Sequence, residues 1–470
     1  MTGSAGVVGR DIVVVIPGIL GSTLRKDGEL VWAPSAGAVT RAIRTLGRSV
    51  RGLTLPQGIG DREPEDGVEA DDVVHGLHLL PGIWSAGIGY RALLRHLEHT
   101  CGLILEQPHE PGLLANLITF PYDWRLSSRA NGRRLKARVT PALERWRAQG
   151  GQFAGAELVL VCHSMGGLVA RWYLEKEGGA EVTRKLVTIG TPHRGAVKAL
   201  AQLVNGVRKG IGPLQADLTE LARSMPSMYE LLPEYACIDS GGKLLRTTEA
   251  SLPGLPTRMV GDGARFHDEL NAAGGAGAHG YDLIPIVGVR QRTWTTARIS
   301  GQRVETLLTI GGEDERGDAT VPRLSATPRW LDLESSIIRW FTDQHGSLHG
   351  NQSVLDELER VLVRPIFRRA APGIEVEAQV EELILAGEDL EITASVAGDT
   401  RVALRADVTG EAGEPVTAVR LRAGGGAHRG VVEGLAPGAY QVTMGGVGAM
   451  AARVSPVTCA TLVWDPMEDA

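Results

Sequence analysis

Short runs of apolar residues alternate with stretches that carry apolar residues at helical spacing through the first two thirds of the chain. Short apolar runs are typical of buried strands, and the helical spacing is typical of amphipathic helices. Strands that alternate with helices favour a parallel sheet covered on both faces. We expect strands over residues 12–16, 117–120, 158–161, 185–189, 284–289, 304–310 and 337–341, and helices over residues 89–99, 135–149, 165–175 and 353–363.

Three segments depart from this alternation. Residues 33–75 are mixed, rich in glycine and acidic toward their end, which favours an insertion or a loop. Residues 197–280 lean toward helix and then become rich in glycine, as expected of a cap over a site. From residue 374 onward the chain consists of short β-like runs between turn signals, with residues 424–430 predicted as one of the turns. This segment is predicted to be a separate β-sandwich of about 95 residues, the usual size of such modules.

Composition narrows the classes of function. The 470 residues include 49 lysines and arginines and 55 aspartates and glutamates, so the net charge is −6, and no strongly basic block points to nucleic acid. Four cysteines lie far apart in the sequence without metal-ligand spacing, so neither a metal site nor a disulfide framework is expected. No apolar run approaches the roughly 18 residues of a membrane span. The first residues lack the pattern of a signal peptide, which predicts a cytoplasmic protein.

One serine stands where a predicted strand meets a predicted helix, in the sequence Cys162-His163-Ser164-Met165-Gly166. This is a variant of G-x-S-x-G, in which a strained turn exposes a nucleophilic serine at the edge of a sheet. Gly166 supplies the small residue on the helix side, whereas Cys162 takes the place of the usual first glycine. The alternative is a loop serine that caps the next helix. The motif predicts an α/β-hydrolase fold with Ser164 as nucleophile.

A serine nucleophile needs a base, and the base needs an orienting carboxylate. In α/β-hydrolases the acid and then the histidine follow the serine in chain order. Asp318 follows the predicted strand 304–310 and is the candidate acid. The neighbouring carboxylates Glu313, Asp314 and Glu315 are interpreted as solvated loop charges, although each competes with Asp318 for the role.

Two histidines follow the last predicted strand. His345 is nearer the end of that strand, where a base can reach back to the serine, so it is the preferred base, and His349 is the alternative. A spacing of four residues is also that of a zinc-binding pair on a helix. The segment is a poor helix former with no third ligand nearby, so no metal is expected.

The oxyanion of an acyl-transfer reaction needs two hydrogen-bond donors. One predicted donor is the backbone N–H of Met165, the residue after the nucleophile. The other is the N–H of Ile19, in the loop after the first strand. The alternative for this loop is an ordinary turn that ends a strand.

Six segments in a fixed order are more specific for a protein family than any one of them alone. They are VVVIPGILGSTL (13–24), FPYDWRLS (120–127), LVCHSMGGLVARWYL (160–174), VTIGTPHRGAVKAL (187–200), PSMYELLP (226–233) and GDATVP (317–322). In this order they resemble the lecithin:cholesterol acyltransferase family, which includes lysosomal phospholipases and phospholipid acyltransferases. The resemblance covers residues 10–365 and implies Ser164 as nucleophile, Asp318 as acid, a histidine base, and Ile19 and Met165 as oxyanion donors. The chain departs from the family at Cys162, where glycine or alanine is usual.

Several residues near these motifs are predicted to line an acyl pocket. They are Leu20, Tyr122, Trp124 and His193. The alternative for His193 is a hydrogen bond that fixes its loop. In the same PYDWR segment, the charges of Asp123 and Arg125 are expected to brace the loop. The apolar segment around Trp84 is interpreted as core packing or a lid.

Residues and resemblance together predict a serine ester hydrolase that acts on lipid-like or other hydrophobic esters through an acyl-Ser164 intermediate, with no cofactor. One alternative is an O-acyltransferase that passes the acyl chain to an alcohol, and another is a catalytically silent hydrolase fold used for binding or assembly. The predicted architecture is a doubly wound, mostly parallel α/β-hydrolase domain (1–368) with its cap (197–280), followed by an immunoglobulin-like β-sandwich (374–470). The expected partners are the ester substrate, a transiently contacted membrane surface and a protein docked on the β-sandwich.

Overall fold

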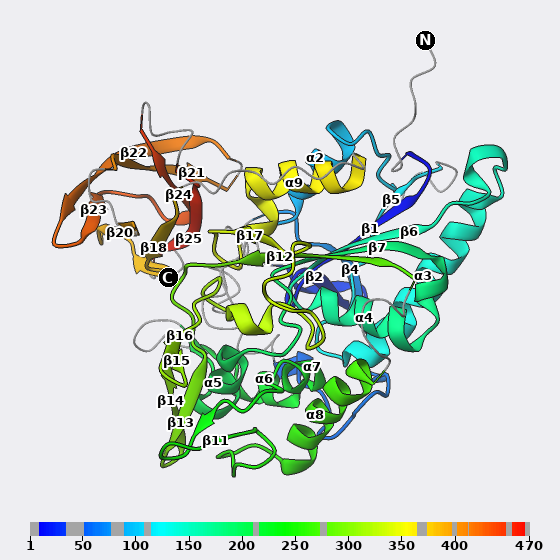
Figure 1. The fold of residues 1–470 in the computed structure, drawn as a ribbon, viewed down its shortest axis with the longest axis horizontal. Helices are drawn as coiled ribbons and strands as arrows, with labels where there is room; N and C mark the ends of the chain where they lie inside the picture. The colour runs from blue at the N-terminus through cyan, green and yellow to red at the C-terminus, as the bar shows by residue number, and fades with distance from the viewer. Residues whose placement is uncertain are drawn as a thin grey trace.

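A parallel sheet with helices on both faces forms the centre of the molecule (Figure 1). The computed structural model describes residues 9–33, 51–76, 89–107, 114–209, 216–272, 280–363, 374–396, 402–411, 413–447 and 454–465. Within these ranges the sheet has six strands in the order β17-β12-β7-β6-β1-β5, and all its pairs are parallel. This topology confirms the predicted α/β-hydrolase class. The strands are β1 (Ile12–Ile16), β5 (Leu117–Thr119), β6 (Leu158–His163), β7 (Thr183–Ile189), β12 (Asp282–Gly288) and β17 (Arg339–Phe341).

The central strands are apolar throughout because both faces of the sheet are covered. In β1, Ile12, Val14 and Ile16 join the core under α3 and α4, whereas Val13 and Val15 join the core under α2 and α9. Figure 1 shows α2 and α9 on one side of the sheet and α3 and α4 on the other. These helices are α2 (Arg91–His99), α3 (Ser128–Arg147), α4 (Gly166–Lys176) and α9 (Gln352–Val363).

Between β7 and β12 the chain leaves the sheet and builds a separate layer of helices and short strands, which lies below the sheet in Figure 1. The use of this layer as a cap stays a prediction. Trp84, the other candidate for a lid, lies outside the described residues. The elements of the layer are α5 (Val197–Asn205), β8 (Arg208–Lys209), β9 (Ala216–Asp217), α6 (Thr219–Ser224), α7 (Pro226–Glu230), β10 (Ile238–Asp239), β11 (Leu244–Leu245) and α8 (Thr257–Asn271).

The prediction that residues 304–310 form a strand of the central sheet is wrong. The first part of this segment is β14, which pairs with β13 as an antiparallel hairpin around Gly301, where φ is 60°. Only Val304 of β14 is buried, so the strand lacks the two apolar faces that a central parallel strand must bury. The last strand of the central sheet before Asp318 is therefore β12, and β13 to β16 lie between them in the chain. The strands of this detour are β13 (Thr296–Ser300), β14 (Arg303–Leu307), β15 (Thr309–Ile310) and β16 (Glu313–Asp314).

Part of the segment expected to be an insertion or a loop, residues 33–75, is a strand instead. β4 completes a three-stranded antiparallel sheet in the order β3-β2-β4. Only its terminal residues Val68 and Val73 are buried, so the sequence shows no alternation that would reveal it. In the same sheet, Asp27 and Gly28 form the two-residue turn between β2 and β3 with positive φ at both positions, as a tight hairpin requires. The strands are β2 (Ser22–Lys26), β3 (Glu29–Trp32) and β4 (Val68–Val73).

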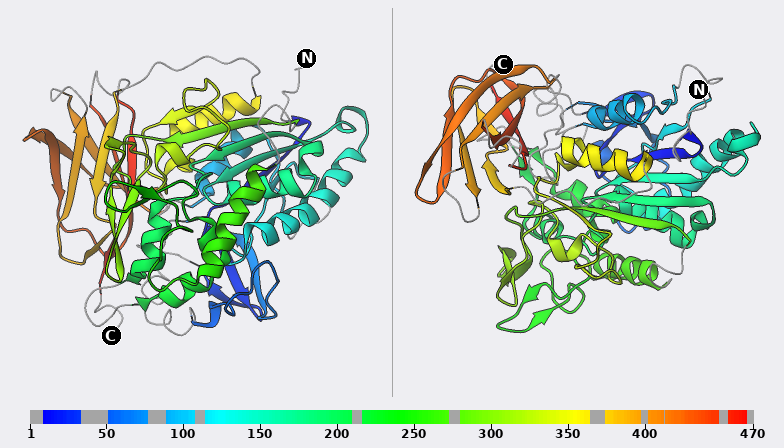
Figure 2. Two further views of the ribbon diagram at one scale, coloured as in Figure 1. Left: turned by 60° about the horizontal axis from the view of Figure 1, so that its bottom comes forward. Right: turned by 45° about the horizontal axis from the view of Figure 1, so that its top comes forward.

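An all-β unit follows the central sheet and stands beside it in both views of Figure 2. Its eight described strands run in the order β18-β20-β23-β22-β21-β24-β25-β19. The long strand β22 pairs with β21 through residues 415–421 and with β23 through residues 422–424, so it links the two halves around one separate core. The strands are β18 (Val376–Val380), β19 (Leu383–Leu385), β20 (Leu390–Val396), β21 (Leu404–Gly410), β22 (Pro415–Gly424), β23 (Ala427–Val432), β24 (Gly438–Gly446) and β25 (Val457–Trp464).

The predicted succession of short strands is present, but β23 lies where a turn was predicted. The predicted turn over residues 424–430 is a turn only at Gly425 and Gly426, where φ is positive, and β23 begins directly afterwards. The limits of the two domains, at residues 368 and 374, stay a prediction.

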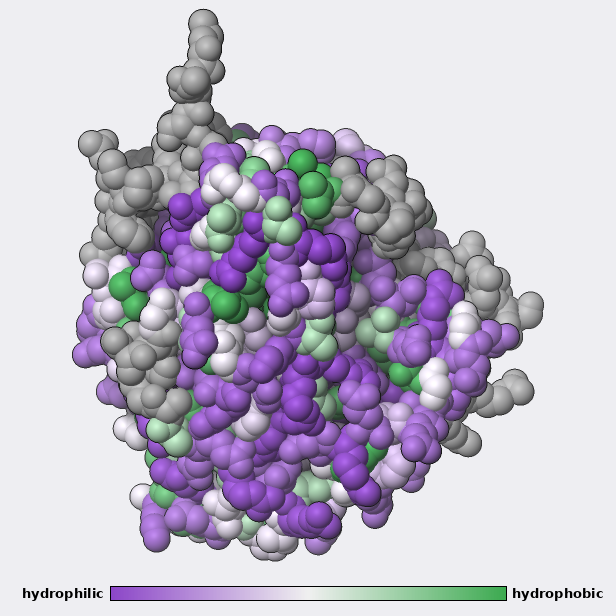
Figure 3. Space-filling model, turned by 90° about the vertical axis from the view of Figure 1, so that its right-hand side faces the viewer, coloured by the Kyte–Doolittle hydropathy of each residue, from purple (hydrophilic) through white to green (hydrophobic). Residues whose placement is uncertain are grey.

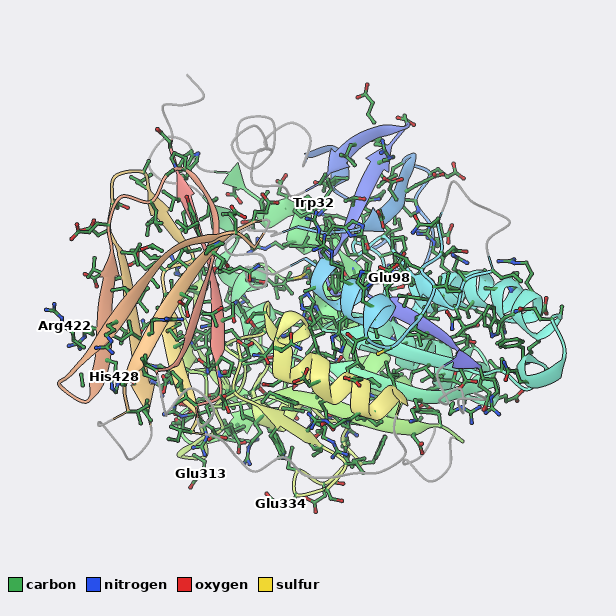
Figure 4. All side chains as sticks on the ribbon, turned by 90° about the horizontal axis from the view of Figure 1, so that it is seen from above. Trp32, Glu98, Glu313, Glu334, Arg422 and His428 are labelled. Atoms are coloured by element: carbon green, nitrogen blue, oxygen red, sulfur yellow. The ribbon has the colours of Figure 1, made fainter. Side chains whose placement is uncertain are left out.

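The surface of the molecule is largely polar in the view of Figure 3, where hydrophobic residues appear as small separate patches. Among the described residues, no helix combines the length and apolar character needed to cross a bilayer. Seen from above in Figure 4, the β unit lies beside α9, and the labelled Arg422 and His428 mark its far edge.

Candidate active site

Ser164 occupies a tight turn between β6 and α4. Its φ is 51°, in the left-handed region that residues other than glycine seldom adopt and that is typical of strained functional positions. The Ser164 N–H donates to Ile189 O at 2.9 Å, and the Ser164 carbonyl accepts from Gly167 N–H at 3.0 Å. The turn therefore has the strand–turn–helix conformation that the motif predicted.

Small residues allow α4 to start directly against neighbouring backbone. A Cβ on Gly166 would lie 2.4 Å from Pro17 O, and a Cβ on Gly167 would lie 2.2 Å from Thr191 Oγ1. Neither position therefore tolerates a side chain without movement. On the strand side, Cys162 is fully buried, and burial raises the pKa of its thiol, so a small neutral side chain stands in place of the usual glycine.

Ser164, His345 and Asp318 form a continuous hydrogen-bonded chain. His345 Nε2 lies 2.8 Å from Ser164 Oγ, and His345 Nδ1 lies 2.8 Å from Asp318 Oδ2. Asp318 Oδ1 accepts from the N–H groups of Thr320 and Val321, at 3.0 and 2.6 Å, and the Asp318 carbonyl accepts from His345 N–H at 2.8 Å. The acid is thus held by the backbone of its own loop and by the backbone of the base.

The competing candidates lie elsewhere. Glu313 and Asp314 are exposed in β16, and Glu315 pairs with Arg323 at 3.3 Å. His349 is buried, and its ring stacks on Tyr90 with 4.6 Å between the ring centroids. The geometry therefore favours Asp318 as acid and His345 as base.

The loop after β1 lies against Ser164, the candidate nucleophile. A Cβ on Gly18 would lie 2.9 Å from Ser164 Cβ, so the backbone that leads into Ile19 passes directly beside the serine. Met165 lies on the other side of Ser164, at the N-terminus of α4, where free N–H groups and the helix dipole favour negative charge. The candidate donor Met165 thus follows the serine in the sequence, and the backbone just before the candidate donor Ile19 lies against the serine in space.

Tyr122 and Trp124, the predicted pocket residues of PYDWR, form hydrogen bonds with the backbone around the loop after β1. The Tyr122 hydroxyl donates to Pro17 O at 3.0 Å, and the Trp124 indole N–H donates to Ser22 O at 3.2 Å. Leu20 has φ of 64°, and its carbonyl accepts from the indole N–H of Trp32 at 3.3 Å. All these side chains are almost completely buried, so their observed contacts are with the loop.

The charged residues within PYDWR form a buried ion pair. Arg125 donates through Nη2 to Asp123 Oδ2 at 2.7 Å and through Nη1 to Asp66 Oδ2 at 2.8 Å. Desolvation opposes the charge on Arg125, but the two carboxylates outweigh it and raise the pKa of the guanidinium. These contacts are the bracing that the sequence predicted for this loop.

His193 is fully buried and makes a local contact. Its Nε2 lies 3.2 Å from Thr188 Oγ1, which matches the loop-fixing alternative. Burial, with the nearby Arg171 charge, holds the pKa of His193 well below its usual range, so the ring is neutral. Its role in lining a pocket stays a prediction.

Two residues beside the site were not singled out from the sequence. The Tyr90 hydroxyl accepts from Gly18 N–H at 2.8 Å and lies 2.8 Å from His163 Nδ1, while His163 Nε2 lies 3.1 Å from His345 O. A carbonyl only accepts, so Nε2 donates; in a neutral ring Nδ1 then accepts from the Tyr90 hydroxyl. Hydrogen bonds therefore run from the loop after β1, through Tyr90 and His163, to the backbone of His345.

Gly190 completes the immediate surroundings of the acid and the base. Its φ is 59°, and a Cβ there would lie 3.1 Å from Asp318 Oδ2 and 3.2 Å from His345 Nδ1. Only a residue without a side chain fits this position comfortably. Across the described residues, no three His, Cys, Asp or Glu side chains group in a way that would hold a metal ion.

The parallel sheet and its strand order place the chain in the α/β-hydrolase fold class, and Ser164, His345 and Asp318 stand in the hydrogen-bonded order typical of serine hydrolases. A family model described as lecithin:cholesterol acyltransferase matches residues 108–254 of the chain, which confirms the resemblance to that family.

Two curated relatives are similar to part of the chain. The lysosomal phospholipase A and acyltransferase of Homo sapiens is 34% identical over 119 residues, and that of Rattus norvegicus is 33% identical over 119 residues. Each alignment covers 24% of this chain and 27% of the relative, so the chain spans about a quarter of the length of these proteins.

Solved structures of low similarity also match. The crystal structure of Bacillus licheniformis lipase BlEst2 in mature form is 12% identical, with a TM-score of 0.36, and the match covers 75% of this chain and 92% of the lipase. The propeptide form of the same lipase gives 13% identity and a TM-score of 0.32, over 73% of this chain and 85% of that one. The fold assignment rests on the strand order described above.

Proposed function

We propose that this chain is a serine ester hydrolase that acts on lipid-like or other hydrophobic esters, with Ser164 as nucleophile, His345 as base and Asp318 as acid. The observation that carries the proposal is the unbroken hydrogen-bonded chain from Ser164 Oγ through the His345 ring to Asp318 Oδ2. A serine that merely capped a helix would need neither partner, nor the strained φ of 51°.

In the first step, His345 Nε2 accepts the proton of the Ser164 hydroxyl as Oγ attacks the ester carbonyl. Asp318 keeps the second ring nitrogen protonated and stabilises the imidazolium that forms. The N–H groups of Ile19 and Met165 donate to the oxyanion, and removal of one such donor typically costs roughly 100- to 1,000-fold in turnover.

Collapse of the tetrahedral intermediate expels the alcohol, which takes the proton from His345, and leaves an acyl group on Ser164. Water then attacks the acyl-enzyme with His345 again as base, and the carboxylic acid leaves. The buried setting of all three groups, each 1% exposed, strengthens these electrostatic interactions.

Acyl transfer is the second candidate, and the names of both curated relatives favour it because each combines phospholipase A with acyltransferase. The same acyl-Ser164 intermediate would pass its acyl group to an alcohol in place of water. Hydrolysis and transfer differ in how the site seats the acceptor and excludes water. Incubation with an ester and a long-chain alcohol, followed by mass spectrometry of the products, separates the two.

The remaining expectations are also proposals: a cytoplasmic location, a transient contact with a membrane surface and a protein partner on the C-terminal β unit. Both curated relatives are lysosomal by name, and this word describes those proteins. Fractionation of cells that express the tagged chain tests the proposed location.

Fluorophosphonate labelling tests the nucleophile and its base. The probe forms a stable adduct with an activated serine, and peptide mass spectrometry locates the adduct. We expect an adduct on Ser164 that is lost in Ser164→Ala and strongly reduced in His345→Ala, but retained in His349→Ala. A folded wild-type chain that stays unlabelled, in buffer and in detergent, would overturn the proposal in favour of a silent fold.

A further inference from the structure

The base lies in a loop that the C-terminal β unit touches directly. We define the base loop as residues 343–351, which connect the end of β17 to α9. His345 is its third residue. The start of β25 lies against this loop, because the N–H of Thr458 donates to Asp343 Oδ1 at 2.9 Å and the carbonyl of Thr458 accepts from the Ser347 hydroxyl at 2.6 Å.

Asp343 is the centre of this contact. Its Oδ1 accepts from Thr458 N–H and from Gln344 N–H at 2.8 Å and lies 2.9 Å from Ser347 Oγ, while its Oδ2 accepts from Asn351 Nδ2 at 2.7 Å. The side chain is fully buried. The Asp343 carboxylate thus forms hydrogen bonds with the start of the base loop, with its last residue and with β25 of the C-terminal β unit.

Asn351 continues the network into α9. Its Oδ1 accepts from the N–H groups of Ser353 and Val354, at 2.8 and 3.3 Å, as an N-cap does. Its amide nitrogen faces Asp343 and also Pro456 O at 3.4 Å. The orientation of the Asn351 amide is therefore fixed at both ends, and so is the direction of each hydrogen bond.

The acid is connected to the same β unit on its other side. The backbone of Gln291 exchanges two hydrogen bonds with Gly317, the residue before Asp318, at 2.9 and 3.1 Å. The Gln291 side-chain amide then donates to Val376 O and accepts from Ala378 N–H, both at 3.0 Å. The side-chain amide of Gln291 thus forms with β18 the same pair of hydrogen bonds that the backbone of a neighbouring strand would form.

Burial of a carboxylate without a cationic partner is unfavourable. Asp343 forms no ion pair among the described residues, and burial raises its pKa to about 6 in spite of the hydrogen bonds that it accepts. A contact that served only to attach the β unit to the catalytic unit would need no buried charge two residues from the base. Active-site side chains keep their orientation through hydrogen bonds from the residues around them, and Asp343 makes such hydrogen bonds within the loop that carries His345.

We propose that Asp343 is a positioning residue through which the C-terminal β unit holds His345 against Ser164, so that this unit is a structural part of the active site. The inference rests on the proposed function for its catalytic consequence. It assigns the β unit a role that differs from recruiting an external partner.

A reciprocal exchange of side chains tests the proposal in the full chain. In Asp343→Asn, the new amide nitrogen faces the amide nitrogen of Asn351, so two donors oppose each other. In the double variant Asp343→Asn with Asn351→Asp, the nitrogen at position 343 donates to a carboxylate at position 351, which still caps α9. The hydrogen bond from Thr458 N–H keeps its acceptor in both variants.

We expect Asp343→Asn to lower kcat for a p-nitrophenyl ester by roughly 10- to 100-fold with little change in KM, because small displacements of a catalytic group cost this much. The double variant should recover most of the loss. Thr461→Val is the matched control: Thr461 is buried in the same strand and donates to Glu381 O at 2.7 Å, away from the base loop. It should lower the melting temperature without changing kcat.

Hydrogen–deuterium exchange of the base-loop peptide provides a readout that does not depend on catalysis. Asp343→Asn should raise exchange over residues 343–351, and the double variant should restore protection. An unchanged kcat in folded Asp343→Asn, a loss of kcat that the double variant does not recover, or an equal loss in Thr461→Val would each overturn the proposal. An inactive wild type with the expected exchange pattern would instead count against the proposed function, because the support of the loop would be intact.

Discussion

Replacement of Tyr90 by phenylalanine removes one oxygen atom from the junction between the oxyanion loop and the base. In the wild type this oxygen accepts from Gly18 N–H and contacts His163 Nδ1, both at 2.8 Å, in a position where Tyr90 is 1% exposed. Each buried group left unpaired costs roughly 1–3 kcal/mol, so we expect a clear loss of stability.

The effect on turnover follows from the position of Gly18 next to Ile19. Complete loss of an oxyanion donor costs roughly 100- to 1,000-fold, and Tyr90→Phe displaces the donor but does not remove it, so we expect kcat to fall by roughly 10- to 100-fold. KM should change little because the substrate is bound before the oxyanion forms. Steady-state hydrolysis of a p-nitrophenyl ester measures both constants, and thermal unfolding measures stability.

Tyr235→Phe is the matched control for this experiment. Tyr235 is also buried, and its hydroxyl donates one hydrogen bond, to Thr295 O at 3.0 Å, in the layer outside the central sheet. It should lose stability and keep its kcat. Equal kcat values for Tyr90→Phe and the wild type would refute the reasoning, because the oxyanion loop would then not depend on Tyr90.

Three further predictions concern other parts of the structure. Gly190→Ala places a Cβ 3.1 and 3.2 Å from the two atoms of the acid–base hydrogen bond, so ester hydrolysis should be almost lost in a chain that circular dichroism shows to be folded; full activity would contradict this. Burial raises the pKa of Glu230 from 4.5 to about 8, so protonation of Glu230 stabilises the folded chain. This contribution to stability is fully present below the unfolded pKa and is lost as pH rises through 8. Glu230→Gln should flatten this decline of about 1.4 kcal/mol per pH unit in urea unfolding between the two pKa values, and parallel curves would count against it. Gly132→Ala places a Cβ 2.6 Å from Trp172 Cδ1 and should destabilise by roughly 1–3 kcal/mol, whereas Gly261→Ala, with no atom within 4 Å, should not; similar melting temperatures would contradict the packing argument.

The sequence predicted the candidate site best where the reactive residue and the elements that position it are contiguous in the chain. The turn at Ser164 follows from a strand, a small residue and a helix that are contiguous in the chain, and the structure brings Ser164, Asp318 and His345 together. Periodicity also located the central strands, because a run such as that of β1 is buried on both faces. The catalytic assignment of these residues remains the proposal made above.

Other features depend on contacts between distant residues, which a single sequence does not reveal. Tyr90 reads as an ordinary core aromatic until the fold places it 2.8 Å from His163, 73 residues away. α3 begins at Ser128, seven residues before the predicted start, because Ser127 caps it and its first turn is polar and yet buried. The apolar run over residues 304–310 was misassigned because its partner strand β13 has no clear alternation either.

The distance along the chain between the base loop and β25 has a consequence for the order of synthesis. Asp343 and Thr458 are separated by 115 residues, so the ribosome completes the parallel sheet and α9 well before the strand that contacts the base loop emerges. Contacts of this separation form late, because the intervening chain must first fold. A nascent chain therefore carries its serine, acid and base for some time before β25 arrives to secure the loop, which would delay the onset of hydrolysis until the β unit has folded.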